Sequence, residues 1–248
     1  MKKTIALLCF WLLRFSVFSQ ENSTSTDKPS YFALSTGSSI PLQNFKSTDI
    51  KNAYAGFAKN GTKKDVLWGK DFNNTPWGVT GLFRMHKNPL DEGALASMAK
   101  TTHPSFDYII SAKEWKLYTL MAGAYYRIPV SKKLTIMPKA MVGLAYIYSP
   151  EINADFNNNS ATVATSFIES SNKLTNSYLF SIGLKSNFYK RIILLSNVDV
   201  LGAFPTFSSV KTTYGNGTTT YGNGTTIYRT KSPTLLTFNY GIGIGYKF

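Results

Sequence analysis

Cysteine is nearly absent from this chain of 248 residues, and the single one, Cys9, lies within the first 19 residues. That segment has a basic start at Lys2 and Lys3 followed by an apolar run, which is the pattern of a secretory signal peptide. We therefore expect residues 1–19 to be removed by cleavage. The mature chain would then contain no cysteine, so a disulfide framework and a cysteine metal site are excluded for it.

Long apolar runs are also absent after residue 19. None approaches the ~20 residues that a membrane-spanning helix needs. Helices and closed barrels are the structures that satisfy every backbone polar group in hydrocarbon. If the mature chain spans a membrane, it must therefore do so as a β-barrel.

Charged residues are few, at 16% of the chain, whereas an ordinary soluble domain carries about a quarter. Acidic residues are the scarcer kind, with 13 Asp and Glu against 27 Lys and Arg, and the net charge is +14. Nucleic acid is the usual partner of so basic a chain. Export argues against nucleic acid, so we expect outer-membrane lipid with anionic headgroups as the counter-charge. Aromatic residues reach 15% and could form the interfacial girdles of a membrane barrel.

The last predicted strand shows the clearest pattern in the chain. Between residues 236 and 248, large apolar residues alternate with small or polar ones, and the row ends on Phe248. Side chains of a strand point to opposite faces with period two, so one face is wholly apolar. An apolar outer face and a small or polar inner face are typical of a transmembrane barrel strand.

Eight strands of this kind are predicted, after a leader at residues 20–29 that we expect to be disordered. Their expected ranges are 30–40, 63–72, 77–86, 115–128, 134–148, 174–189, 192–204 and 234–248. The connections after the second, fourth and sixth strands are short, whereas the other connections each have roughly twenty to thirty residues. Outer-membrane barrels have short periplasmic turns and long external loops. The sequence therefore predicts an all-β, eight-stranded antiparallel up-and-down transmembrane barrel over residues 30–248, with both mature termini in the periplasm.

A soluble lipocalin-like barrel also has eight strands, and alternation by itself does not exclude it. The signal peptide, the loop asymmetry and the terminal aromatic residue together favour the membrane barrel.

Two segments near the amino terminus resemble a known family. Residues 31–45 end in Ser-Ile-Pro-Leu-Gln-Asn-Phe and look like the first strand of the small porin-family outer membrane protein β-barrel domains, with Gln43 where glycine is usual. Residues 52–61 are similar to the Gly-Phe-Ala stretch of the same proteins. The resemblance implies an OmpA/OmpX-like eight-stranded barrel and transfers no catalytic residue. It also implies that Tyr246 and Phe248 form an insertion signal for the barrel assembly machinery.

Charged residues on the predicted inner face define candidate lumen positions. They are Arg84, Arg127, Lys139, Lys185 and Lys247, with Asp199 and Asp71 of opposite sign. Eight strands enclose a space that side chains fill, so we expect a plugged lumen held by ion pairs. The alternative is a small pore, which the excess of positive charge would make permeable to anions.

The connection before the last strand contains an internal repeat. Thr-Thr-Tyr-Gly-Asn-Gly-Thr occurs at 212–218 and again at 219–225. Asn-Gly is the preferred two-residue hairpin turn, and tyrosine binds partners with little loss of entropy. The candidate recognition residues are Tyr214, Asn216, Tyr221 and Asn223. The interpretation we favour is a loop enlarged by local duplication without a selected partner, because exposed loop tips accept insertions readily.

Candidate catalytic chemistry is sparse. The histidines are His86 and His103, and the polar residues near them are Asp91, Glu92, Ser105 and Asp107. A lipid-active outer-membrane hydrolase could be built from such residues, but no pair has a diagnostic spacing, so we interpret them as polar residues of a solvated loop. We therefore expect a non-enzymatic barrel with a structural or surface-recognition role, no cofactor and no metal site. The sequence identifies no external ligand.

Overall fold

The computed structural model describes residues 30–49, 52, 54–102, 104–158, 161–216, 226–231 and 234–248. The expected signal peptide at 1–19 and leader at 20–29 lie outside the described residues.

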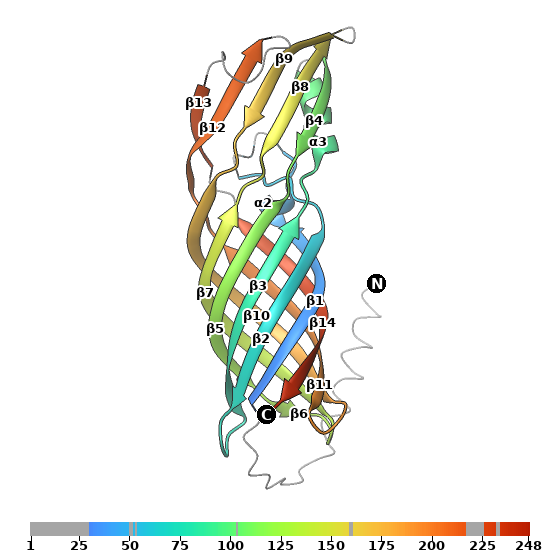
Figure 1. The fold of residues 1–248 in the computed structure, drawn as a ribbon, viewed down its shortest axis with the longest axis vertical. Helices are drawn as coiled ribbons and strands as arrows, with labels where there is room; N and C mark the ends of the chain where they lie inside the picture. Colours follow the sequence, from blue (N-terminus) through green and yellow to red (C-terminus); the bar gives the residue numbers. More distant parts are fainter. Residues whose placement is uncertain are drawn as a thin grey trace.

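Eight antiparallel strands close into a barrel (Figure 1). They are β1 (Ser30–Leu42), β2 (Gly61–Asp71), β3 (Trp77–Asn88), β5 (Trp115–Tyr126), β7 (Leu134–Tyr148), β10 (Asn172–Asn187), β11 (Ile192–Ala203) and β14 (Leu235–Lys247). Their order is β10-β11-β14-β1-β2-β3-β5-β7, and pairing of β10 with β7 closes the ring. The short β6 (Ile128–Pro129) pairs with the start of β7. The predicted fold is confirmed, and each predicted boundary lies within two residues of the observed one.

The register of the barrel is staggered. The ring can be followed from Ile242 of β14 by moving at each step to the directly paired residue on the next strand. Through β1, β2, β3, β5 and β7 this path ends at Leu174 of β10. In the other direction, through β11, it ends at Leu184 of β10. These two residues of β10 are ten positions apart, and this offset is the shear of the barrel. With eight strands it corresponds to a strand tilt of about 45°, which leaves an interior that side chains can fill.

The outer wall of the barrel is apolar. Outward side chains of the middle of the wall are well exposed, as at Leu144 (47%), Ile182 (60%) and Ile242 (70%). Exposed aromatic residues gather toward the end with the short turns, among them Phe32, Trp68, Trp77, Tyr126, Phe188, Tyr189, Tyr246 and Phe248. An apolar wall with an aromatic belt around a polar interior is the arrangement of a transmembrane barrel.

Within the described residues, no helix is both long enough and apolar enough to cross a membrane.

The long connections fold into a second sheet that stands beyond one end of the barrel (Figure 1). Its strands are β4 (Asp107–Ala112), β8 (Ile152–Asn158), β9 (Ala161–Ile168), β12 (Phe207–Asn216) and β13 (Thr226–Lys231), in the order β13-β12-β9-β8-β4. We call it the external sheet. The sequence indicated only a hairpin turn within the repeat in this region, so most of this sheet is a feature that the sequence pattern did not predict.

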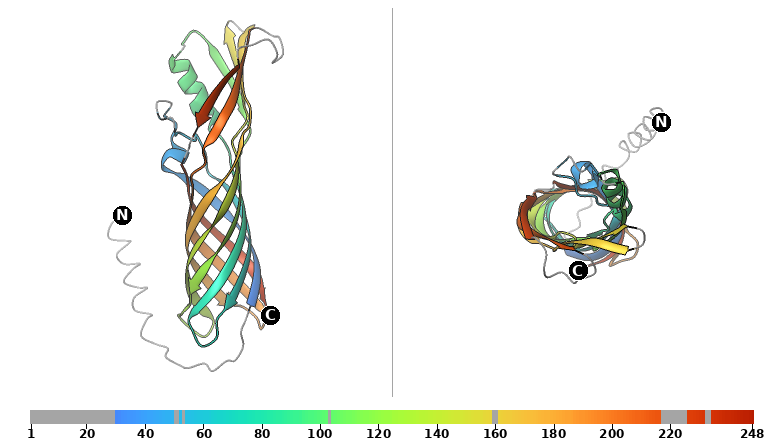
Figure 2. Two further views of the ribbon diagram at one scale, coloured as in Figure 1. Left: turned by 90° about the vertical axis from the view of Figure 1, so that its left-hand side faces the viewer. Right: turned by 90° about the horizontal axis from the view of Figure 1, so that it is seen from above.

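Helix α3 (Glu92–Thr102) lies beside β4 (Figure 2). The Asp91 side chain accepts a hydrogen bond from the backbone N–H of Ala94 at 3.1 Å, which caps the first turn. The Glu92 side chain accepts one from the N–H of Ala112 at the end of β4, at 2.7 Å. Asp91 therefore caps the helix, and Glu92 fixes it to the edge of the external sheet.

Helix α2 (Gln43–Lys46) is a single turn after β1. Gln43 has φ 49°, in the left-handed region that favours glycine. This conformation gives a physical reason for the glycine that is usual at this position in the family the segment resembles. The turn directs Phe45 into the barrel end, where it is fully buried.

The two ends of the described barrel meet at the short-turn end. The N–H of Phe248 donates to the carbonyl of Ser30 at 2.9 Å, and β14 pairs with both β1 and β11. No strand edge of the barrel is therefore left open in this region.

Candidate functional site

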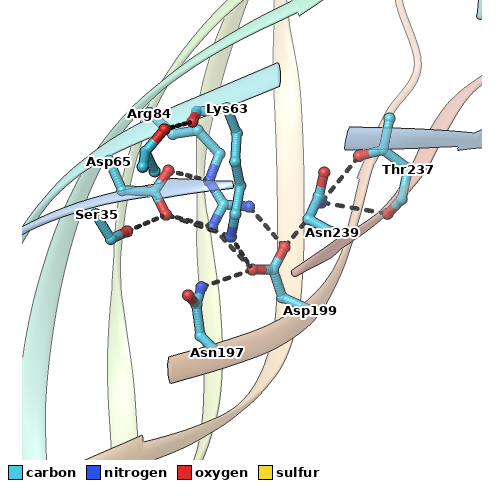
Figure 3. A network of polar contacts seen from close by, with 9 residues as sticks. Ser35, Lys63, Asp65, Arg84, Asn197, Asp199, Thr237 and Asn239 are labelled. Carbon is cyan, nitrogen blue, oxygen red and sulfur yellow. Dashed lines mark hydrogen bonds and ion pairs between the residues drawn. The ribbon is translucent and has the colours of Figure 1, made fainter. Parts of the chain in front are cut away.

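A cluster of four charged side chains occupies the middle of the lumen (Figure 3). Lys63 and Asp65 come from β2, Arg84 from β3 and Asp199 from β11, and all four are buried. Arg84 Nε donates to Asp65 Oδ1 at 2.7 Å, and its Nη1 donates to Asp199 Oδ1 at 2.6 Å. Lys63 Nζ donates to Asp199 Oδ2 at 3.0 Å. We call these residues the central ion cluster.

Neutral side chains complete the hydrogen bonds of the central ion cluster. Asn197 and Asn239 donate to Asp199 at 3.0 and 2.8 Å, and Ser35 donates to Asp65 at 3.0 Å. The cluster itself contains two cations and two carboxylates, so its charges balance. Buried charges are tolerated when they are paired and hydrogen-bonded in this way, whereas removal of one partner is costly.

Lys139 lies beside this cluster without joining it. Its side chain is buried, and within the described part of the chain it makes no hydrogen bond or ion pair. Together with Arg84, Asn197 and Asp199 it lines an interior cavity of about 20 Å³, which has room for about one water molecule. At this level the lumen is filled by side chains.

A second group of polar residues lies near the short-turn end of the lumen. Asp71 accepts hydrogen bonds from the Tyr125 hydroxyl and from Arg127 Nη1, the latter at 3.0 Å. Lys185 Nζ lies 3.8 Å from the same carboxylate and 5.1 Å from the centre of the Tyr31 ring. Lys247, the remaining lumen candidate, is half-buried near the end of β14. The candidate charges are thus divided between two levels of the barrel.

The opposite end of the lumen is closed by apolar side chains. Phe45 of α2 contacts Trp115 edge to face, with ring centroids 5.6 Å apart, and Trp115 lies 6.1 Å from Phe207. Trp115 Nε1 also donates to the carbonyl of Gly56 at 2.9 Å. A side chain at Gly56 would meet Phe45, so this glycine permits the close approach. These contacts form an apolar plug between the lumen and the external sheet.

The residues proposed for a hydrolase do not come together. His86 is not on a solvated loop, as the sequence had allowed, but is buried inside the barrel, and its ring nitrogens have no hydrogen-bond partner among the described residues. Asp91 and Glu92 hold α3, and Asp107 pairs with Lys100 at 2.9 Å. His103 lies outside the described residues. In the described part of the chain, no group of three His, Cys, Asp or Glu side chains could hold a metal ion.

Five lysines of the external region are paired with carboxylates. The pairs are Lys59–Asp91, Lys87–Glu114, Lys100–Asp107, Lys113–Glu151 and Lys211–Glu169, with N–O distances from 2.6 to 3.6 Å. The charges of these five lysines are therefore compensated locally. Uncharged side chains are also presented, among them Ile109, 61% exposed on β4, and Tyr54.

The first copy of the sequence repeat forms part of the external sheet. Tyr214 and Asn216 lie on β12, opposite Ser166 and Ala164 of β9. Tyr221 and Asn223 of the second copy lie outside the described residues. The terminal aromatic residues lie at the other end of the molecule, where Tyr246 faces outward and accepts a hydrogen bond from Arg191 Nη1 at 2.8 Å.

Sequence reasoning missed Lys63 and Asp65, which supply half of the central ion cluster. The signal was present in the alternation of β2, because Asp71, Gly69, Leu67, Asp65 and Lys63 follow one another with period two. Asp65 and Lys63 therefore share the inner face with Asp71.

Comparisons with known proteins show the fold alone. A major outer membrane protein from Thermus thermophilus is 12% identical, with a TM-score of 0.52, and the match covers 88% of this chain and 99% of that one. Ail, the attachment invasion locus protein of Yersinia pestis, is 15% identical with a TM-score of 0.46, covering 90% and 100%. Neisserial surface protein A is 13% identical with a TM-score of 0.45, covering 88% and 97%. No protein-family model and no curated protein matches the sequence.

The closed ring of strands, the apolar outer wall and the filled lumen together define a structural class of membrane protein. The chain has the fold of the small eight-stranded outer-membrane β-barrels, as the sequence resemblance predicted.

Proposed function

We propose that this chain is an integral outer-membrane protein without enzymatic activity, whose external sheet serves as a rigid surface for recognition. The observation that carries the proposal is the contrast between the two ends of the fold. The long connections pair into an ordered five-stranded sheet, whereas the lumen holds a cavity of only about 20 Å³ between its charged side chains. Binding residues are commonly placed on connections that a rigid scaffold positions.

The chemistry of this surface favours a protein partner over a polyanion. Three of its lysines, Lys100, Lys113 and Lys211, are paired with carboxylates, and its exposed side chains include isolated apolar and aromatic residues. Interfaces between proteins are enriched in aromatic residues and poor in lysine at their centre. The same proposal includes the repeat residues, namely Tyr214 and Asn216 on β12 and Tyr221 and Asn223 between β12 and β13.

Site-specific photo-crosslinking on intact cells tests recognition. A photoreactive residue at Ile109, on the exposed face of β4, should give an adduct with a partner protein of defined mass. The same residue at Ile182, on the lipid-facing wall, is the matched control and should give none. Absence of an adduct at Ile109, with folded barrel at normal abundance, would contradict a recognition role.

The proposed orientation places the external sheet outside the cell and both mature termini in the periplasm. Epitope tags within 91–100, 155–165 and 214–224 should be reachable by antibody on intact cells, whereas tags at Thr75 or Ser131 should be hidden. The reverse labelling pattern would overturn this topology.

We propose further that Tyr246 and Phe248 act in insertion by the barrel assembly machinery. Both are exposed at the short-turn end, and β14 must pair with β1 and β11 to close the ring. Replacement of both by serine should lower the amount of heat-modifiable barrel in the membrane and raise the periplasmic pool. Unchanged membrane levels would contradict this role.

The pore alternative is tested by conductance in planar bilayers. The proposed plugged lumen predicts no conductance above that of the bare bilayer, whereas a stable anion-selective step would support the pore.

A further inference from the structure

A groove of about 680 Å³ lies on the outer wall of the barrel, across β11, β14, β1, β2 and β3. It is lined mainly by outward apolar side chains, including Leu34, Val66, Phe83, Leu194, Ile242 and Ile244. Its volume falls within the range of ~300–1,000 Å³ that is usual for small-molecule sites. In a transmembrane barrel the molecules that reach this wall are lipids.

One cation lines the groove. Lys64 of β2 faces outward between Thr36 of β1 and Met85 of β3, which are its direct partners in the two neighbouring strands. It is three residues from Gly61, where β2 begins at the end of the barrel that carries the external sheet. With a rise of about 3.3 Å per residue and a tilt of about 45°, Lys64 lies roughly 7 Å below that end of the strand. A lysine this close to the end of a lipid-facing wall can extend its ammonium toward the headgroup region, where a negatively charged headgroup is the favourable partner.

The other outward lysines differ from Lys64. Lys87 and Lys116 lie near Glu114, with N–O distances of 2.8 and 4.0 Å. Lys70 lies at the short-turn end of β2, next to the terminal Asp71 and away from the groove. Within the described residues Lys64 makes no ion pair or hydrogen bond. Lys64 thus combines an apolar groove with a cation that the described protein residues leave uncompensated.

We propose that this groove is a binding site for one membrane lipid with a negatively charged phosphate headgroup. An acyl chain lies along the apolar lining, and the phosphate reaches the Lys64 ammonium in the half of the wall nearest the external sheet. The ammonium donates hydrogen bonds to the phosphate oxygens, as lysine does in other phosphate sites. The site depends on the barrel fold and not on the proposed recognition by the external sheet.

Native mass spectrometry of the full chain tests the proposal. The barrel is released from detergent with dimyristoylphosphatidylglycerol or with dimyristoylphosphatidylcholine, which carry the same acyl chains. The unaltered protein should retain one molecule of the anionic lipid in preference to the zwitterionic one. Lys64→Gln should weaken that retention by about fivefold or more, since a lysine near anionic lipid contributes on this scale. Lys64→Arg should restore it.

Two controls separate this site from general attraction. Lys70→Gln removes the same charge from the same strand and should leave retention unchanged, and Leu34→Trp should reduce it by filling the groove. Heat-modifiable gel mobility establishes that each variant is folded. Equal retention of the two lipids, or equal loss in Lys64→Gln and Lys70→Gln, would overturn the proposal. Displacement of the lipid by millimolar inorganic phosphate would also overturn it, because the acyl chain would then contribute nothing.

Discussion

The barrel and the external sheet are both antiparallel sheets, yet they differ in how each is held together. The barrel closes on itself through pairing of β10 with β7, so none of its strands is an edge. The external sheet is open and has two edge strands, β13 and β4, of which β4 is covered in part by α3. The barrel has a wide apolar face turned to lipid, whereas the external sheet carries paired charges. The barrel is therefore stabilised by closure of the ring and by contact with lipid, whereas the external sheet is stabilised by contacts among its own residues and α3.

The interior of the barrel adds a further contrast. Its middle is held by the central ion cluster, and its end toward the external sheet is held by the apolar plug. The ion cluster fixes strands β2, β3 and β11 to one another through directional bonds. The plug instead joins the barrel to a connection outside it, through Phe45 and the carbonyl of Gly56.

The largest effect is expected at Asp199. Replacement by asparagine leaves Arg84 and Lys63 with one carboxylate, Asp65, and should lower the free energy of unfolding by about 3–5 kcal/mol. Urea unfolding in lipid vesicles measures this change. The double variant Asp199→Leu with Arg84→Met leaves Lys63 paired with Asp65 and should recover most of the loss. A cost below about 1 kcal/mol for Asp199→Asn would show that the cluster does not hold the barrel.

The plug should be the next most sensitive element. Phe45→Ala removes a fully buried ring and should cost about 3–5 kcal/mol in the local stability of the connection that follows β1. The N–H groups of Gly56 and Ala58 donate to carbonyls of Asn44 and Phe45, so their hydrogen exchange should accelerate. Exchange within β2 should remain slow. An equal increase in the exchange rates of both segments would show that Phe45 stabilises the whole barrel and not only this connection.

An arginine scan compares the two sheets directly. At Ile182 on the barrel wall, arginine near mid-depth should cost about 2–4 kcal/mol in lipid. At Ile109 of β4, which has almost the same exposed fraction, arginine should change stability by no more than about 0.5 kcal/mol. Refolding yields and urea midpoints in lipid vesicles measure the change in stability at each of the two sites. Equal tolerance at the two sites would mean that the wall does not face hydrocarbon.

The smallest effect is expected at the turn between the two regions. Gln43 has a left-handed backbone conformation, with φ 49°, which glycine adopts without the steric cost of a side chain. Gln43→Gly should therefore stabilise the protein by about 0.5–1 kcal/mol. Gln43→Val should destabilise it, because a β-branched residue adopts this conformation poorly. Thermal unfolding in lipid measures both changes, and the same sign for the two variants would contradict the conformation of this turn.

Period-two alternation predicted the barrel strands because lipid and lumen impose opposite chemistry on alternate residues of every strand. The stretch from 236 to 248 shows this pattern without interruption. The external sheet has no such constraint. Residues 152–157 of β8 are all half-buried, and their sequence, Ile-Asn-Ala-Asp-Phe-Asn, resembles a polar loop. Its pairing is determined by contacts with β4 and β9, which are distant in sequence.

The candidate site shows the same limit. Alternation assigns Arg84 and Asp199 to the inner face but does not state which charges meet, because that depends on the shear of the barrel. With an offset of ten residues, Asp199 of β11 lies within reach of Arg84 of β3, across the lumen. The burial of His86 could have been read from its parity with Arg84, two residues earlier on β3.

Hydrogen exchange of the full chain in lipid nanodiscs tests the central claim most directly, namely that the external sheet is an ordered continuation of the scaffold. β8 and β9 each pair with a strand on both sides, whereas β4 is an edge strand. The account predicts that backbone amides within 152–157 and 164–168 exchange at least about a hundredfold more slowly than an unfolded chain, and more slowly than those of β4. Exchange at unfolded rates throughout β8 and β9, with the barrel strands still protected, would contradict it.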